Sequence, residues 1–321
     1  MAQWLLNRLF DARNQRNPNF AFQGTVNWMR ALALITEEGA FDDATLDNNY
    51  SQVSRRAVNT EADTLVFENM MMAYHNQASL VNLFNDSSHP YDICRSAIIS
   101  WYYSTYFTCS AMVAAASGSL QETHAQTAKV WQSDIISSGL VMAPFSLNLT
   151  SLVEQTVIEE MAAYRQDNEH NLNTYPENNE QAWGAVFSYL KGTWDYEKSK
   201  IEERVRKSRE FRELGVENFR TRNAQNLRNE HLSRHHVNYL VQAFRYRGKA
   251  NYRDSIFLSY GYDNTDKVAQ FIDDLEAVSK VFQRMAAFYL SKRVERGSWS
   301  EFVSDLEENS RLSLEPRYLQ V

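Results

Sequence analysis

Glycine, proline and cysteine are scarce in this chain of 321 residues. It contains 10 Gly, 5 Pro and 2 Cys, where average usage would be roughly 7% Gly and 5% Pro. So few turn-forming residues exclude a fold of many short strands, and they argue against Gly-rich loops that cradle nucleotides. Apolar residues make up 44% of the chain, enough for a sizeable core. We therefore predict an all-α fold, a bundle of about nine or ten helices.

Other absences bear on location and ligands. No basic start or apolar core of a secretion signal precedes Arg8 and Asp11, so we expect a cytoplasmic protein. Residues 97–117 carry no charge, but their repeated Ser, Thr and Tyr favour a buried bundle helix over a membrane span. Cys94 and Cys109 lie several turns apart in one predicted helix and cannot pair within it. We expect no disulfide, no membrane segment and no cofactor.

Hydrophobic periodicity and breaker residues divide the chain into predicted helices. The clearest pattern lies in 265–293, where apolar residues recur at three- and four-residue steps, as in a core-facing helix. Polar residues around Pro176 make 166–181 a predicted linker or exposed excursion. We predict an N-terminal helical region over 1–90, a helical bundle over 91–296 and a C-terminal tail over 297–321. The predicted helices cover 4–10, 25–36, 62–84, 91–117, 121–138, 147–165, 182–213, 217–247, 252–260 and 265–293.

Positive charge is concentrated in one stretch of an otherwise acidic chain. The net charge is −7 at pH 7, yet residues 198–253 hold 15 of the 33 Lys and Arg and only 6 of the 40 Asp and Glu. Such a stretch can hold a phosphate-rich or acidic partner while the rest of the surface repels polyanions. The i,i+4 pairs Glu202 with Arg206 and Glu203 with Lys207 also fit a helix face that is merely solvated. Both interpretations stay open at this point.

The predicted helix 217–247 carries the residues best suited to chemistry on a phosphate. Five polar residues fall within about 80° of one another on a helical wheel: Arg228, His231, His235, Asn238 and Gln242. Arginine offers phosphate a permanent charge, and histidine exchanges protons near neutral pH. In RNA cleavage without metal, His235 would act as general base or acid and Arg228 would stabilise the phosphorane. His231 and His235 also have metal-ligand spacing, so a metal-binding helical protein is a third alternative.

Three segments between residues 96 and 145 share features with a known family. The first is 96–106, Ser-Ala-Ile-Ile-Ser-Trp-Tyr-Tyr-Ser-Thr-Tyr. With its small residues and paired tyrosines, it resembles the first helix of the HEPN superfamily. Glu122-Thr123-His124 resembles the Thr-His pair that commonly opens the next helix, and 139–145 continues the likeness. The resemblance covers the chain in outline from 91 to 293 and implies a helical bundle that frequently forms homodimers. Many HEPN domains are metal-independent ribonucleases of toxin–antitoxin, CRISPR or phage-defence systems.

The signature of these ribonucleases is Arg, a polar residue, and His after four to six intervening positions. Arg228, Asn229 and His235 fit it. The resemblance therefore implies RNA cleavage by Arg228 and His235. Arg165 and His170 also fit and form an alternative pair.

A cluster of cations and aromatic residues follows the signature. Basic and aromatic side chains alternate there: Phe244, Arg245, Tyr246, Arg247, Lys249, Tyr252 and Arg253. Such a cluster is suited to stacking bases and holding phosphates. We expect its four cations, Arg245, Arg247, Lys249 and Arg253, to bind nucleic acid together with Asn229 and His231.

These patterns predict an RNA-directed, metal-independent endoribonuclease of HEPN type in a bacterial defence or toxin system. The alternative is a non-catalytic HEPN-like subunit whose basic face binds nucleic acid or a protein partner such as an antitoxin. A homodimer without a resident metal is expected.

Overall fold

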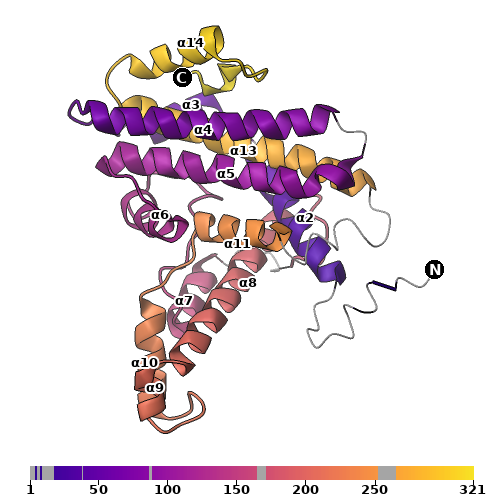
Figure 1. Cartoon of the computed structure of the whole chain (residues 1–321), viewed down its shortest axis with the longest axis vertical. Helices are drawn as coiled ribbons and strands as arrows, with labels where there is room; N and C mark the ends of the chain where they lie inside the picture. Colours follow the sequence, from indigo (N-terminus) through magenta and orange to yellow (C-terminus); the bar gives the residue numbers. More distant parts are fainter. Residues whose placement is uncertain are drawn as a thin grey trace.

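Helices form the regular structure in the computed structural model of the chain, which describes residues 4–5, 8, 18–37, 39–86, 89–164, 171–251 and 265–321. Within those residues no β-strand occurs, only an isolated antiparallel bridge between Leu149 and Val237. The predicted all-α class is confirmed. In chain order the elements are α2 (Pro18–Glu37), α3 (Asp43–Asn49), α4 (Thr60–Asp86), α5 (Pro90–Ser117), α6 (His124–Val130), the π-helix η1 (Trp131–Ile136), α7 (Glu154–Tyr164), α8 (Asn179–Arg206), α9 (Arg209–Glu213), α10 (Arg222–Ser233), α11 (Tyr239–Asn251), α13 (Thr265–Arg293), α14 (Ser298–Asn309) and the 3-10 helix η2 (Pro316–Leu319) (Figure 1).

The long helices α4, α5 and α13 lie side by side between α14 on one side and α6 and α11 on the other, and form the central helices of the fold (Figure 1). Small side chains let α5 and α13 approach closely: the hydroxyls of Ser104 and Ser279 hydrogen bond at 2.7 Å. Gln283 of α13 donates to Ser104 and to the carbonyl of Ala73 on α4, so these particular buried polar groups are paired. The predicted burial of 97–117 is confirmed.

The apolar stripe predicted on 265–293 is also confirmed, because its members are buried in α13. Helices α2 and α4, from the first 90 residues, pack against α13 and α5. No helix in the described ranges has the length and apolar character to cross a membrane. Cys94 and Cys109 are buried and free, as expected. The division into regions at 90 and 296 stays a prediction.

A buried aromatic cluster joins α2, α5, α8 and α11. The Trp28 ring of α2 stacks on Tyr189 of α8 with centroids 4.2 Å apart, and it meets Trp101 of α5 edge-on at 5.9 Å. Tyr246 of α11 contacts Trp28 and Trp101 at 4.9 and 5.4 Å. Its hydroxyl donates to a backbone carbonyl of α2 at 2.7 Å. Such rings bury large apolar areas, so the cluster fixes how the four helices meet.

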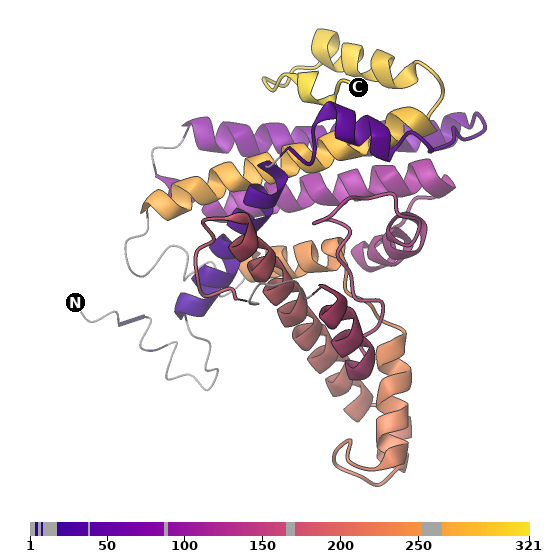
Figure 2. The ribbon, with the colours of Figure 1, turned by 180° about the vertical axis from the view of Figure 1, so that it is seen from behind.

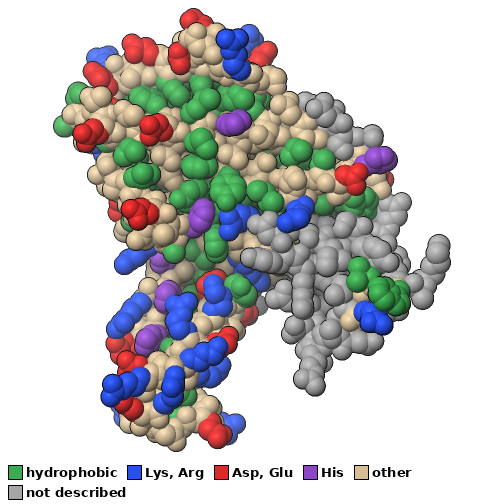
Figure 3. Space-filling view, viewed as in Figure 1, with side chains coloured by type: hydrophobic (Ala, Val, Ile, Leu, Met, Phe, Trp, Pro, Cys, Tyr) green, Lys and Arg blue, Asp and Glu red, His purple; other side chains and the backbone are tan. Residues whose placement is uncertain are grey.

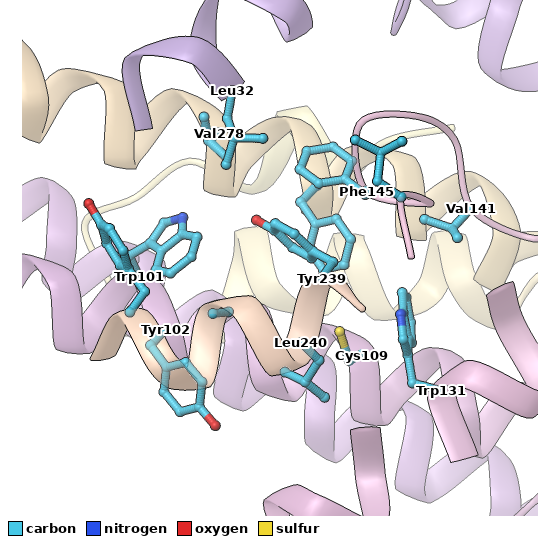
Figure 4. Packing of buried hydrophobic residues seen from close by; sticks show 14 of the residues in the cluster. Leu32, Trp101, Tyr102, Cys109, Trp131, Val141, Phe145, Tyr239, Leu240 and Val278 are labelled. Carbon is cyan, nitrogen blue, oxygen red and sulfur yellow. The ribbon is translucent and has the colours of Figure 1, made fainter. Parts of the chain in front are cut away.

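The N-terminal end of α11 is held in the same core. Figure 4 shows Tyr239 between Trp101 and Phe145. Its ring centroid lies 6.4 Å from that of Trp101 and 4.9 Å from that of Phe145. Because Tyr239 and Tyr246 are both buried, α11 cannot rotate about its axis without exposing one of them.

Helices α7, α8, α9 and α10 form an arm that extends from the central helices (Figure 1 and Figure 2). Two long predicted helices are broken there, and these predictions were wrong. The helix expected over 182–213 ends at Arg206, and Ser208 starts α9 by accepting a hydrogen bond from the amide of Phe211.

The helix expected over 217–247 is interrupted between α10 and α11. Val237 pairs with Leu149 through hydrogen bonds of 2.7 and 2.9 Å, which leaves the chain extended there. The side chain of Asn238 then caps α11 by accepting from the amide of Val241, and it donates to the carbonyl of Ala128 at 2.9 Å. Tertiary hydrogen bonds thus override the local helical pattern.

Several other boundaries differ from the predictions. The helix expected over 121–138 divides into α6 and the π-helix η1, and the one expected over 147–165 begins only at Glu154. Helix α3 was not anticipated, and the predicted tail over 297–321 contains α14 and η2. The predicted helices 4–10 and 252–260 lie outside the described residues, apart from positions 4–5 and 8.

The aromatic cluster predicts a large difference between two apolar truncations. Trp28→Ala should lower the free energy of unfolding by about 3–5 kcal/mol, because the site cannot collapse around the missing ring. Ile158→Ala, at a position that is 57% exposed, should change it by less than about 0.5 kcal/mol. Urea denaturation followed by circular dichroism measures both, and equal losses would contradict the assigned role of the cluster.

Candidate nucleic-acid interface

The outer part of the arm, residues 198–234, carries 11 Lys and Arg but only 6 Asp and Glu. Figure 3 shows Lys and Arg side chains gathered over its visible face. Many of these cations face a carboxylate one helical turn away: Arg206 with Glu202, Lys207 with Glu203, Arg209 with Glu213 and Arg234 with Glu230. The two i,i+4 pairs named from the sequence are therefore confirmed. They contribute a few tenths of a kcal/mol each, roughly, and they neutralise part of the face.

Four arginines of the arm are different. Arg204, Arg212, Arg220 and Arg222 are exposed, and within the described residues no carboxylate lies within ion-pair distance of them. Arg212 donates instead to the backbone carbonyl of Lys207 at 2.6 Å. Within the described residues, no carboxylate therefore neutralises these four guanidinium groups through an ion pair.

Arg228 does not belong to this exposed set. Its guanidinium donates twice to the side-chain oxygen of Asn229, at 3.0 and 3.1 Å, and lies 3.8 Å from a carboxylate oxygen of Glu202. It also covers the ring of Phe219, whose other cationic neighbour is Arg206. With 20% of its side chain exposed, Arg228 serves mainly to join α10 to α8. Asn229 serves as its acceptor.

His235 lies beyond the end of α10, on the extended segment that leads to Val237. The expected arrangement of Arg228 and His235 on one helix face is therefore wrong. Burial lowers the pKa of His235, and nearby Arg204 lowers it further. His236 and His231 act in the same direction, while Glu197 opposes them. These surroundings together favour the neutral imidazole of His235.

The metal-binding alternative gains no support here. In the ranges that the structure describes, no group of three or more His, Cys, Asp or Glu side chains has an arrangement that would hold a metal ion. His236, the next histidine, makes a 3.2 Å hydrogen bond to the carbonyl of Ala128.

The arginines of α11 were expected in one cluster, but they lie on opposite sides of the helix. Tyr246 between them is buried, and neighbours one position away are turned by about 100° to either side. Arg245 faces α8, where it donates to the hydroxyl of Thr193 at 3.0 Å and covers the ring of Tyr196. There it lines a cavity of about 190 Å³. Arg247 faces α5.

Arg247 is held by aromatic side chains. Its guanidinium lies 4.7 Å from the ring centroid of Tyr102 and 5.0 Å from that of Phe244, and it donates to the hydroxyl of Tyr103 at 3.0 Å. Such contacts keep a cation at a protein surface without a carboxylate. The side chain of Lys249 and all of Arg253 lie outside the described residues, as do Arg165 and His170.

His124 belongs to the same place and was not among the predicted site residues. Its Nδ1 atom lies 2.8 Å from the hydroxyl of Tyr102, and its ring packs on Tyr106 at 4.3 Å. Burial lowers the pKa of His124, and the charge of Arg247 adds to the effect. The paired tyrosines and the Thr-His pair belong to the segments that resemble the HEPN superfamily. The sequence alone does not indicate that Arg247 of α11 contacts them.

No protein-family model, curated protein or solved structure matches this chain. A functional assignment therefore depends on the arrangement of side chains. Four exposed arginines of the arm form no ion pair with a carboxylate of the described residues, and a cation lies against aromatic rings on each side of α11. The HEPN resemblance stays a resemblance.

The arrangement predicts how two histidines respond to loss of a neighbouring arginine. Arg247→Gln should raise the pKa of His124 toward the ordinary value of 6.5, because a nearby cation disfavours the imidazolium. Arg204→Gln should do the same for His235. Each variant serves as the control for the other in histidine-detected NMR titrations. A pKa of His124 that stays unchanged in Arg247→Gln would contradict the described proximity.

Proposed function

We propose that this protein binds single-stranded RNA through the arm and α11, without cutting it. The observation that carries the proposal is the set of exposed arginines on the arm, Arg204, Arg212, Arg220 and Arg222, that face no carboxylate among the described residues. Phosphates would supply the missing anions and release their counterions on binding. The acidic remainder of the chain would keep the strand from binding elsewhere.

Exposed aromatic rings beside cations favour a single strand over a duplex. Tyr196 on α8 is 41% exposed and is flanked by Arg245 at 5.1 Å and Lys200 at 5.2 Å. Phe244 on α11 is also 41% exposed and neighbours Arg247. Unstacked bases can lie on such rings while the cations hold the adjacent phosphates.

The contacts of Arg228 argue against the expected catalytic pair. A group that stabilises a phosphorane needs free donors aimed at the phosphate, whereas Arg228 donates to Asn229 and faces Glu202. The side chain of His235 is half-buried on a separate segment. The homodimer implied by the resemblance and the cytoplasmic location expected from the N-terminal sequence stay predictions.

Cleavage is tested directly by incubating total RNA with the protein in EDTA. We expect the RNA to stay intact, because the Arg228 guanidinium is engaged within the arm. RNA cleavage by the wild-type protein that disappears in His235→Ala would contradict this and support the ribonuclease prediction instead.

Binding is tested by removing three of the unpaired arginines together. The variant Arg204→Gln/Arg220→Gln/Arg222→Gln should bind a short single-stranded RNA about tenfold more weakly at moderate salt. The slope of log K against log salt should fall in magnitude by about 2, because three phosphate contacts are lost. Fluorescence anisotropy over a salt series measures both quantities.

A second triple variant provides the control. Arg296→Gln/Arg311→Gln/Arg317→Gln removes the same charge at exposed positions near the C-terminus. It should retain wild-type affinity within about twofold. If both triple variants lose affinity equally, net charge and not the arm controls binding, and the proposed interface is wrong.

A further inference from the structure

The junction of α5, α6 and α11 brings together side chains that the arm does not use. They are Tyr102 and Tyr103 from α5, His124 from α6, and Phe244 and Arg247 from α11. The rings of His124 and Phe244 lie 5.6 Å apart, and the Arg247 guanidinium lies 5.0 Å from the Phe244 ring. The positive charge of Arg247, the imidazole of His124 and the exposed ring of Phe244 are therefore adjacent.

A hydrogen bond joins His124 to α5. Its Nδ1 atom lies 2.8 Å from the Tyr102 hydroxyl, and which of the two donates depends on the imidazole tautomer. Burial raises the pKa of Tyr102 far above its ordinary range, so the phenol keeps its hydrogen and is able to donate. In the tautomer in which Tyr102 donates to Nδ1, the proton of the neutral imidazole is on Nε2, and His124 offers an N–H donor.

Arg247 supplies charge at the same place. Tyr103 accepts one of its hydrogen bonds at 3.0 Å, and the rings of Tyr102 and Phe244 cover it. No carboxylate forms an ion pair with it among the residues that the structure describes. The other N–H groups of this fixed guanidinium are able to donate hydrogen bonds to a phosphate oxygen.

We propose that His124, Arg247 and Phe244 form a binding site for one nucleotide of a single-stranded RNA. The guanidinium of Arg247 and Nε2–H of His124 hold its phosphate, and its base stacks on the exposed face of Phe244. This inference rests on the proposed function, because the strand that crosses the arm would supply the nucleotide. The site positions RNA and performs no bond-breaking step.

The test uses a short single-stranded RNA that contains 2-aminopurine, whose fluorescence falls when it stacks. Phe244→Ala should weaken binding about tenfold, within the range for removing one base–aromatic stack, and should abolish the quenching on binding. It should leave the salt slope unchanged, because no charge is removed. The matched control is Met72→Ala, which truncates another apolar side chain that is 43% exposed.

Arg247 is tested with two substitutions because its side chain is partly buried. Arg247→Lys retains the charge but loses the planar fork, so we expect weaker binding with a wild-type salt slope. Arg247→Gln should weaken binding further and lower the slope by about 0.7, the value for one phosphate on a single strand. Circular dichroism and the unfolding midpoint establish that each variant is folded. Arg311→Gln is the control for loss of one charge.

The outcomes separate the two proposals. If Phe244→Ala and Arg247→Lys bind like the wild-type protein while the arm variant binds weakly, the nucleotide site on α11 is wrong and RNA binding by the arm stands. If Phe244→Ala loses binding and quenching while the arm variant binds normally, α11 binds the strand and the proposed role of the arm is wrong. If the wild-type protein binds no single-stranded RNA, both proposals are wrong.

Discussion

The stacking of Trp28 on Tyr189, with ring centroids 4.2 Å apart, connects the central helices to the arm. Trp28 belongs to α2, which packs on α13. Tyr189 belongs to α8, and the C-terminal half of α8 forms part of the arm. Tyr246 closes the cluster from α11. A change in this packing would therefore move the arm and α11 together, since both are anchored to the same rings.

Burial of Tyr246 determines where the positive charges of α11 lie. Because that residue faces the core, Arg245 and Arg247 are turned to opposite sides, one toward α8 and one toward α5. A linear cluster of cations thereby becomes two separate sites, each backed by aromatic rings. The four unpaired arginines of the arm add a third positive region. Positive regions that lie on different elements suit an extended, flexible polyanion better than a compact ligand.

The sequence was most informative where local pattern and packing agree. The helices over 265–293 and 91–117 were predicted to within one residue, because the apolar side chains that mark them in the sequence are the ones that pack in the core. The breaks at Ser208 and near Val237 were missed. The break at Ser208 depends on the helix cap that this side chain forms. The break near Val237 depends on pairing with Leu149, a residue far away in sequence. The candidate pair on one helix failed for that reason, and His124 was missed since its partner Arg247 comes from a distant helix.

The central claim is that a single RNA strand lies on the arm and on α11, and photo-crosslinking tests it most directly. The full-length protein would be irradiated with single-stranded RNA that contains 4-thiouridine, and the modified peptides would be mapped by mass spectrometry. The account predicts crosslinks in α8 to α10 and at Phe244, with competition by unlabelled RNA. Specific crosslinks confined to α4 or α14, or none at all, would contradict it.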